Sequence, residues 1–148
     1  MKRYFLVAMI FTLATTSINA QIRKIPSEVT EAFKAKFPGA DKVEWKDKIT
    51  YFEAQFTADG NEMTADFLSD GTWKETDKSI TYDALPDAVK DGFKKSKYAD
   101  WTPGSVTLIE KSDGTKQYKV YAEKDSVVQK KFLFFSTSGR LEREALPI

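Results

Sequence analysis

Carboxylate side chains carry most of the reactive chemistry in this sequence, because the chain contains no histidine and no cysteine. Their absence removes the commonest general base, the thiol nucleophile and the usual zinc ligands. Carboxylate pairs are the remaining possibility, and adjacent strands would bring Glu53 and Asp66 to the same side of a sheet. A catalytic pair needs a water-poor cleft that shifts its pKa values. We therefore interpret the pair as part of a solvated face balanced by Lys119 and other lysines, and we predict no catalytic residue.

The stretch FTADGNEMTADFLSDGTW, residues 56–73, offers a second kind of chemistry, a calcium loop. Such a loop needs several oxygen ligands at alternating positions and a closing glutamate, a spacing that DGNEMTADF does not supply. Asp59-Gly60 and Asp70-Gly71 lie between apolar segments, where tight hairpin turns need residues with positive φ. The remaining glycines are isolated, so no phosphate-binding loop is present. We expect no metal site and no cofactor.

Two similar segments, IPSEVTEAFKAKF at 25–37 and LPDAVKDGFKKSK at 85–97, have the apolar spacing of helices. Each carries proline in the first turn, where helices tolerate it, and Ser27 and Asp87 are placed to cap the free amides. The matching residues are Ile25 and Leu85, Pro26 and Pro86, Val29 and Val89, and Phe33 and Phe93. The sequence therefore predicts two equivalent helices.

After each helix the apolar period changes to two, which is the period of a half-buried strand. The alternating sets are Val43 and Trp45; Phe52, Ala54 and Phe56; Met63, Ala65 and Phe67; Val106 and Leu108; and Tyr118, Val120 and Ala122. Residues 127–135 are predicted as a long apolar strand. Asp59-Gly60, Asp70-Gly71, Asp113-Gly114 and Ser138-Gly139 mark the turns. We predict an α+β fold, a tandem repeat of a helix followed by a four-stranded antiparallel meander, with repeats 21–82 and 83–148 in one compact unit.

These segments resemble the PepSY-like family of small secreted proteins, which are also described as similar to beta-lactamase-inhibitor protein. The resemblance rests on IPSEVTEAFKAKFPGADKVEW and YFEAQFTADGNEMTADFLSDGTWKET, and more weakly on a second copy in which Leu141 replaces the tryptophan. It implies a curved sheet of up to eight strands with both helices packed on one face. Most family members have no assigned activity, and relatives act by binding proteins, as peptidase or lactamase inhibitors. No inhibitory residue is carried over to this chain.

The first 20 residues have the layout of a secretory signal peptide, with Lys2 and Arg3 before an apolar run and a cleavage site after Ala20. The apolar run is shorter than the ~20 residues of a membrane span. We therefore expect a periplasmic or secreted protein without a membrane anchor after cleavage. The mature chain would carry 21 basic and 22 acidic residues. That balance gives no nucleic-acid footprint.

The outer side of the predicted second repeat is aromatic where that of the first is polar. Tyr121, Phe132 and Phe134 occupy positions that correspond to polar residues such as Thr64 and Asp66. Exposed aromatic clusters mark interfaces, which favours a partner-binding patch. The alternative is packing against the other repeat, its linker or the C-terminal segment, and a register slip of one residue would reverse the two faces.

The sequence thus favours an exported, non-enzymatic protein that binds a protein or peptide partner through the exposed sheet face. Inhibition of an envelope enzyme is one version of this hypothesis. The alternative is binding of a small ligand or a polysaccharide, which a concave apolar pocket would favour. An enzyme is the third class, and loss of a hydrolase activity on Glu53→Gln would support it.

Overall fold

Eight antiparallel strands dominate the computed structural model, which describes residues 23–124 and 129–147. The elements are α1 (Ser27–Lys36), β1 (Asp41–Asp47), β2 (Phe52–Ala58), β3 (Asn61–Phe67), β4 (Trp73–Ile80), the 3-10 turn η1 (Tyr82–Ala84), α2 (Asp87–Lys95), β5 (Thr102–Lys111), β6 (Lys116–Lys124), β7 (Gln129–Ser136) and β8 (Leu141–Ala145). The predicted signal peptide and residues 127 and 128 of the predicted strand 127–135 lie outside the described residues. No helix of the described part is long and apolar enough to cross a membrane.

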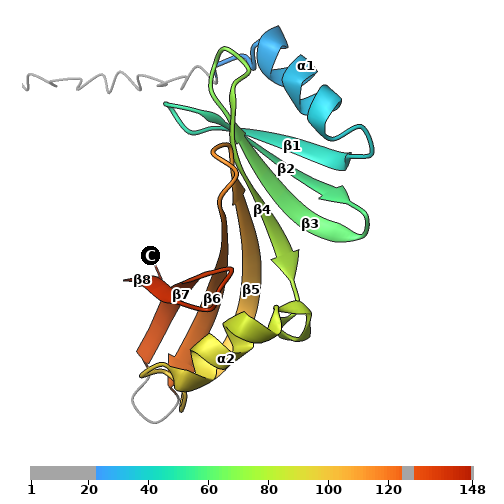
Figure 1. Ribbon diagram of the computed structural model, residues 1–148. Coiled ribbons are helices and arrows are strands. Elements are labelled where there is room, and N and C mark those ends of the chain that lie inside the picture. The colour runs from blue at the N-terminus through green and yellow to red at the C-terminus, as the bar shows by residue number, and fades with distance from the viewer. Residues whose placement is uncertain (1–22, 125–128, 148) are drawn as a thin grey trace, which may run out of the picture.

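All eight strands belong to one sheet, and each strand pairs with its neighbours in chain order from β1 to β8. Figure 1 shows β4 and β5 side by side between the β1–β3 end, near α1, and the end where α2 lies. Their ladder runs from the pair Glu75 and Lys111 to the pair Ile80 and Val106. The sequence left open whether two sheets would be continuous, and this ladder makes them one.

The predicted fold class is wrong. The described residues form one uninterrupted sheet with about half of them in strands, so the fold is mostly β with little helix rather than a tandem helix–meander repeat with helices packed on a sheet. A helix of ten residues is about 15 Å long, whereas eight strands at their usual spacing span roughly 34 Å. Such short helices cannot form a layer, and each contributes only two buried side chains.

The predicted hairpin turns are confirmed at all four sites. Asp59 and Gly60 have φ values of 51° and 73°, the left-handed conformation that a two-residue turn between β2 and β3 requires. Gly71, Gly114 and Gly139 also have positive φ, between the strand pairs β3–β4, β5–β6 and β7–β8. Local turn chemistry therefore fixes the meander.

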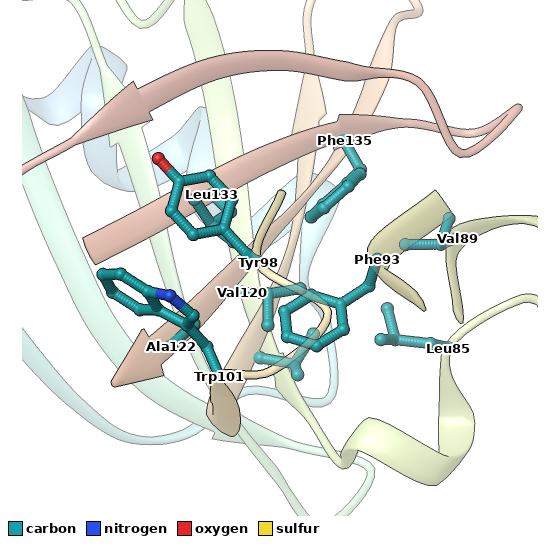
Figure 2. Close-up of a cluster of buried hydrophobic side chains, with 10 residues drawn as sticks. Leu85, Val89, Phe93, Tyr98, Trp101, Val120, Ala122, Leu133 and Phe135 are labelled. Atoms are coloured by element: carbon teal, nitrogen blue, oxygen red, sulfur yellow. The ribbon is translucent and has the colours of Figure 1, made fainter. Parts of the chain in front are cut away.

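Apolar side chains on one side of the sheet gather in two clusters. The first combines Val29 and Phe33 of α1 with Phe52, Ala54, Phe56, Ala65 and Phe67 of β2 and β3. The second combines α2 side chains with residues of η1, β5, β6 and β7, and Figure 2 shows Val89 and Phe93 directed toward Val120 and Phe135. The predicted alternation of β2, β3 and β6 is thus confirmed. In β7 the three successive residues Leu133, Phe134 and Phe135 are all buried. We call this side the cluster face.

Three local predictions need correction. Pro26 and Pro86, rather than Ser27 and Asp87, occupy the N-cap positions, and neither makes a side-chain cap. Val43 was expected on the buried side of β1, but it is 37% exposed. The register shifts between Asp41 and Glu44, and this bulge interrupts the alternation that the sequence suggested.

Glycines bring the last hairpin directly against α2. A Cβ atom built on Gly92 would lie 1.9 Å from the carbonyl oxygen of Gly139. A Cβ atom on Gly139 would lie equally close to the carbonyl oxygen of Ala88. Only glycine allows the helix and the β7–β8 turn to approach at this distance, so this contact fixes the position of β8 against α2.

Candidate functional site

The side of the sheet opposite the two clusters carries the residues that the sequence analysis singled out. Successive side chains of a strand point to opposite faces, so residues that alternate with the buried ones lie on this outer face. The strand register places Tyr121 opposite Phe132 and Lys119 opposite Phe134. Phe134 in turn lies opposite Arg143 of β8. Strand alternation thus places all three predicted binding residues, Tyr121, Phe132 and Phe134, on one face.

Tyr121 and Phe132 form a half-buried aromatic pair across β6 and β7. Their ring centroids lie 5.7 Å apart with an interplanar angle of 62°, an edge-to-face arrangement. Gly104 of β5 makes room for the tyrosine, because a Cβ atom there would lie 2.8 Å from the ring carbon Cδ1. The Tyr121 hydroxyl donates a hydrogen bond to Glu123 at 3.2 Å. The pair is therefore held in place while part of both rings remains accessible.

Phe134 differs from its two neighbours because its ring is covered. It is only 6% exposed, and the guanidinium carbon of Arg143 lies 3.5 Å from the ring centroid. This contact is a close cation–π interaction. Phe134 is therefore a packing residue beneath the outer face, and Arg143 presents its charge at that position.

Strand β8, which supplies Arg143, is attached to the end of α2 by Glu144. Its carboxylate accepts hydrogen bonds from the hydroxyl of Tyr98 and the ammonium group of Lys131, and it pairs with Lys97 at 2.8 Å. The hydrogen bonds from Lys97, Tyr98 and Lys131 lower the pKa of Glu144 to about 2. The carboxylate is thus ionised at neutral pH and helps to hold β8 in register with Arg143 on the outer face.

An acidic row crosses the other half of the outer face. Glu53 of β2 lies opposite Asp66 of β3, and Asp66 lies opposite Glu75 of β4. Burial, followed by repulsion from Glu53, Glu75 and Asp77, raises the pKa of Asp66 to about 7. The prediction that Glu53 and Asp66 share one side is confirmed, but the interpretation as a solvated, lysine-balanced face is wrong at Asp66.

Lys119 does not balance that row, because it pairs with a different carboxylate. Its ammonium group lies 3.0 Å from Oδ2 of Asp77. The other oxygen of Asp77, Oδ1, is buried and has no hydrogen-bond partner among the described residues. The described residues contain no group of three or more metal-ligating side chains that could hold an ion.

A shallow hollow of about 430 Å³ lies on the outer face, between the acidic row and the aromatic pair. Residues of β1 to β5 line it, including Gln55, Thr64, Asp77, Ser79 and Thr107. Its lining is mostly polar. The hollow therefore differs from the concave apolar pocket that would favour a small apolar ligand.

Several solved structures from Bacteroides species share this fold. A protein from Bacteroides fragilis described as "BLIP-like" is 28% identical with a TM-score of 0.75, over 84% of this chain and 88% of that one. A protein from Bacteroides ovatus is 26% identical with a TM-score of 0.78, over 84% and 89% of the two chains. A "putative periplasmic" protein from Bacteroides eggerthii, at 23% identity, matches with a TM-score of 0.78 over 84% and 90%.

The fold, an antiparallel sheet whose strands pair in chain order, thus places this chain in a class of small sheet proteins that includes these solved structures. Residues 50–143 match the model of the family described as "putative beta-lactamase-inhibitor-like, PepSY-like". That range is more than half of the chain, and the chain belongs to this family. The resemblance found in the sequence is confirmed. None of the curated proteins compared with the chain matches it.

Three outer-face residues were missed by sequence reasoning. Gly104 lies inside β5 beneath Tyr121, a contact that the segment WTPG does not indicate. Arg143 could be placed over Phe134 only with the β7–β8 register, which shifts between Phe134 and Phe135. Asp77 lies in β4, where the sequence TDKSI has no apolar alternation to indicate its face.

Proposed function

We propose that this protein is an exported, non-enzymatic binding protein whose outer sheet face engages a protein or peptide partner. The observation that carries the proposal is the half-buried pair of Tyr121 and Phe132 on that face, seated over Gly104. Aromatic side chains in rigid settings are typical centres of binding energy at protein interfaces. The proposed location is the periplasm or the exterior of the cell.

Two further features support a partner rather than a reaction. Charged groups surround the aromatic pair, with Lys119 and Arg143 near the phenylalanine rings and Glu123 bonded to Tyr121. An apolar centre with a polar rim is the usual composition of a protein interface. The family description and the "BLIP-like" name of the Bacteroides fragilis protein also favour protein binding. Inhibition of an envelope enzyme is the finer form of this proposal.

The test is affinity capture from native envelope extract followed by a direct binding measurement with the purified partner. Three forms of the protein serve as bait: wild type, Tyr121→Ala/Phe132→Ala, and the control Val43→Ser. Val43 is an exposed apolar residue on the edge strand β1, so its change removes apolar surface away from the patch. We expect the double variant to bind the captured partner at least tenfold more weakly, about 1.4 kcal/mol or more.

Circular dichroism and thermal unfolding show whether each bait is folded before capture. Phe134→Asp is unsuitable, because Phe134 is buried and a charge there would disrupt packing. A partner bound equally by wild type and by a folded double variant contradicts the assignment of the patch. A partner lost from Val43→Ser but not from the double variant would place the binding site on β1.

A further inference from the structure

The hollow on the outer face combines an excess of negative charge with hydrogen-bonding groups. Three carboxylates, those of Glu44, Glu62 and Asp77, line it together with one ammonium group, that of Lys42. Its volume of about 430 Å³ lies within the range of roughly 300–1,000 Å³ that is common for ligand sites. The hollow is therefore large enough to admit one side chain of a partner.

Asp77 contributes a carboxylate to the hollow that Lys119 compensates from one side. Lys119 neutralises the oxygen Oδ2 at 3.0 Å, while Oδ1 has no donor among the described residues. Because Oδ1 is buried, a ligand would experience it as an under-compensated charge rather than contact it directly. In the low dielectric beneath a sheet surface such a charge acts more strongly than in water.

The acidic row next to the hollow adds to this potential. Glu53, Asp66 and Glu75 occupy one cross-strand row, and Asp77 lies two residues after Glu75 on the same face of β4. Repulsion among these carboxylates contributes to the raised pKa of Asp66, after burial. The same carboxylates thus place negative charge on the surface of β2 to β4 beside the hollow.

We propose that this hollow is the binding site for a cationic side chain of the partner, best fitted by arginine. The partner would insert this side chain beside the aromatic pair of Tyr121 and Phe132. The inference rests on the proposed function and names a chemical feature of the partner. The side chains of Gln55, Thr64, Ser79 and Thr107 supply acceptor oxygens around the hollow. A guanidinium group has five donors in a fixed plane and no acceptor, so it can use several such oxygens together.

Lys119 lies between the hollow and the aromatic pair. Its ammonium group pairs with Asp77 and also lies 5.9 Å from the centroid of the Phe132 ring. A partner with an apolar side chain next to an arginine could therefore occupy both positions on one continuous surface. An anionic side chain would meet three carboxylates in the hollow, which disfavours it.

The test is a ¹H–¹⁵N NMR titration of the purified full chain with N-acetyl-arginine amide. N-acetyl-citrulline amide is the matched control probe, because it has nearly the same shape but no charge, and N-acetyl-lysine amide tests the guanidinium preference. We expect saturable shifts of the Thr64, Ser79 and Thr107 amide signals with arginine only, or with arginine more strongly than lysine. Asp77→Asn should weaken this binding several-fold.

Two further variants separate the outcomes. Glu62→Gln changes an exposed carboxylate of the hollow and should also weaken arginine binding even if Asp77→Asn does not fold. Asp70→Asn removes an exposed carboxylate that does not line the hollow, so it should leave arginine binding unchanged. Three results would overturn the proposed arginine site. They are equal amide shifts with the citrulline and arginine probes, no shift of the amide signals in the hollow, or unchanged arginine binding in both Asp77→Asn and Glu62→Gln. If arginine binds in the hollow and the Tyr121→Ala/Phe132→Ala variant still captures the partner, the proposed role of the aromatic pair is wrong. The proposed arginine site would then still hold.

Discussion

Asp66 holds its proton at higher pH than an ordinary aspartate because its surroundings disfavour the negative charge of the ionised carboxylate. Burial is the main cause, and the carboxylates of Glu53, Glu75 and Asp77 add repulsion that Lys74 only partly offsets. Lys48 pairs with Glu53 at 3.6 Å. Lys46 of β1 lies opposite Glu53, and Lys111 of β5 lies opposite Glu75. The side chain is therefore protonated in the folded protein over a range in which the unfolded chain has lost that proton.

This difference predicts that stability falls as pH rises from about 4 to 8. Asp66 has an ordinary pKa of 3.8 when unfolded and a pKa of about 7 when folded. Its contribution is fully present below pH 4 and is lost as pH passes through 7. Urea unfolding at pH 5 and pH 8 should show a decrease that Asp66→Asn reduces by on the order of 2 kcal/mol, after allowance for solvent screening.

Asp70→Asn is the matched control on the turn that follows β3. The backbone and side chain of Thr72 donate hydrogen bonds that lower the pKa of Asp70, so its contribution is lost only as pH falls, outside the tested window. Its variant should keep the wild-type decrease between pH 5 and pH 8. An equal decrease in wild type and Asp66→Asn would show that Asp66 is not the titrating group.

At the residue scale, the sequence predicted the sheet face of a side chain better than the side chain's solvent exposure. Alternation correctly placed Tyr121, Phe132 and Phe134 on one side, because the side-chain period of a strand is fixed. It could not show that Arg143 covers Phe134, since that contact depends on the β7–β8 register. It also could not show the raised pKa of Asp66, which depends on burial and on three carboxylates of the two neighbouring strands β2 and β4.

At the scale of single elements, α2 shows a glycine that a helix would ordinarily not favour. Gly92 lies inside the helix, where alanine would be more favourable by about 1 kcal/mol. In this protein the same change would place Cβ 1.9 Å from the Gly139 carbonyl oxygen. We expect Gly92→Ala to lower the free energy of unfolding by about 2 kcal/mol, because overpacking costs more than helix propensity returns.

Urea unfolding measures this effect, with Gly39→Ala as the control. A Cβ atom on Gly39 would meet no other atom within 4 Å, so that variant should stay within about 0.5 kcal/mol of wild type. A Gly92→Ala protein more stable than wild type would show that α2 and the β7–β8 turn are not in direct backbone contact.

The elements themselves could be predicted where their signals are local. Asp-Gly and Ser-Gly turns and the alternating apolar residues identified β2, β3 and β6 and their hairpins. The bulge in β1 could not be predicted, because Lys42 adopts a positive φ of 53° that no local residue preference demands. The sequence also could not explain why glycine occupies position 92, because the explanation depends on Gly139, in a turn 47 positions later in the chain.

At the scale of the whole molecule, two apolar clusters share one sheet but no buried residue. We expect each cluster to control the local stability of its own strands. Val29→Ala and Val89→Ala are matched changes, because both valines are fully buried and lie on α1 and α2. Each should cost about 2 kcal/mol through lost burial and a residual cavity.

Native-state hydrogen exchange distinguishes the two variants. Val29→Ala should reduce amide protection mainly in β2 and β3, and Val89→Ala mainly in β6 and β7. This result would support the predicted division into 21–82 and 83–148. Equal loss of protection throughout the sheet in both variants would instead show one cooperative unit joined through β4 and β5.

The fold class was the part of the whole that the sequence predicted wrongly. The helical spacing at Val29 and Phe33 and at Val89 and Phe93 correctly identified two helices, and each meander was predicted from its own turns. The resemblance of the two halves led to an expectation of repeated helix–sheet layers. The ladder of β4 and β5 has few apolar residues, so nothing local indicated that eight strands would form one dominant sheet.

The strand order has a consequence for how the chain reaches its structure. Because every strand pairs only with its neighbours in the chain, each ladder except β4–β5 closes a short loop once the previous strand is in place. The β4–β5 ladder forms across residues 81–101, which contain η1 and α2. Short loops cost little entropy to close, and proteins rich in local contacts fold faster than those with distant pairings. Each half of the sheet, β1–β4 and β5–β8, can therefore grow by adding one strand at a time, and the protein should refold faster than a β-sandwich of equal length.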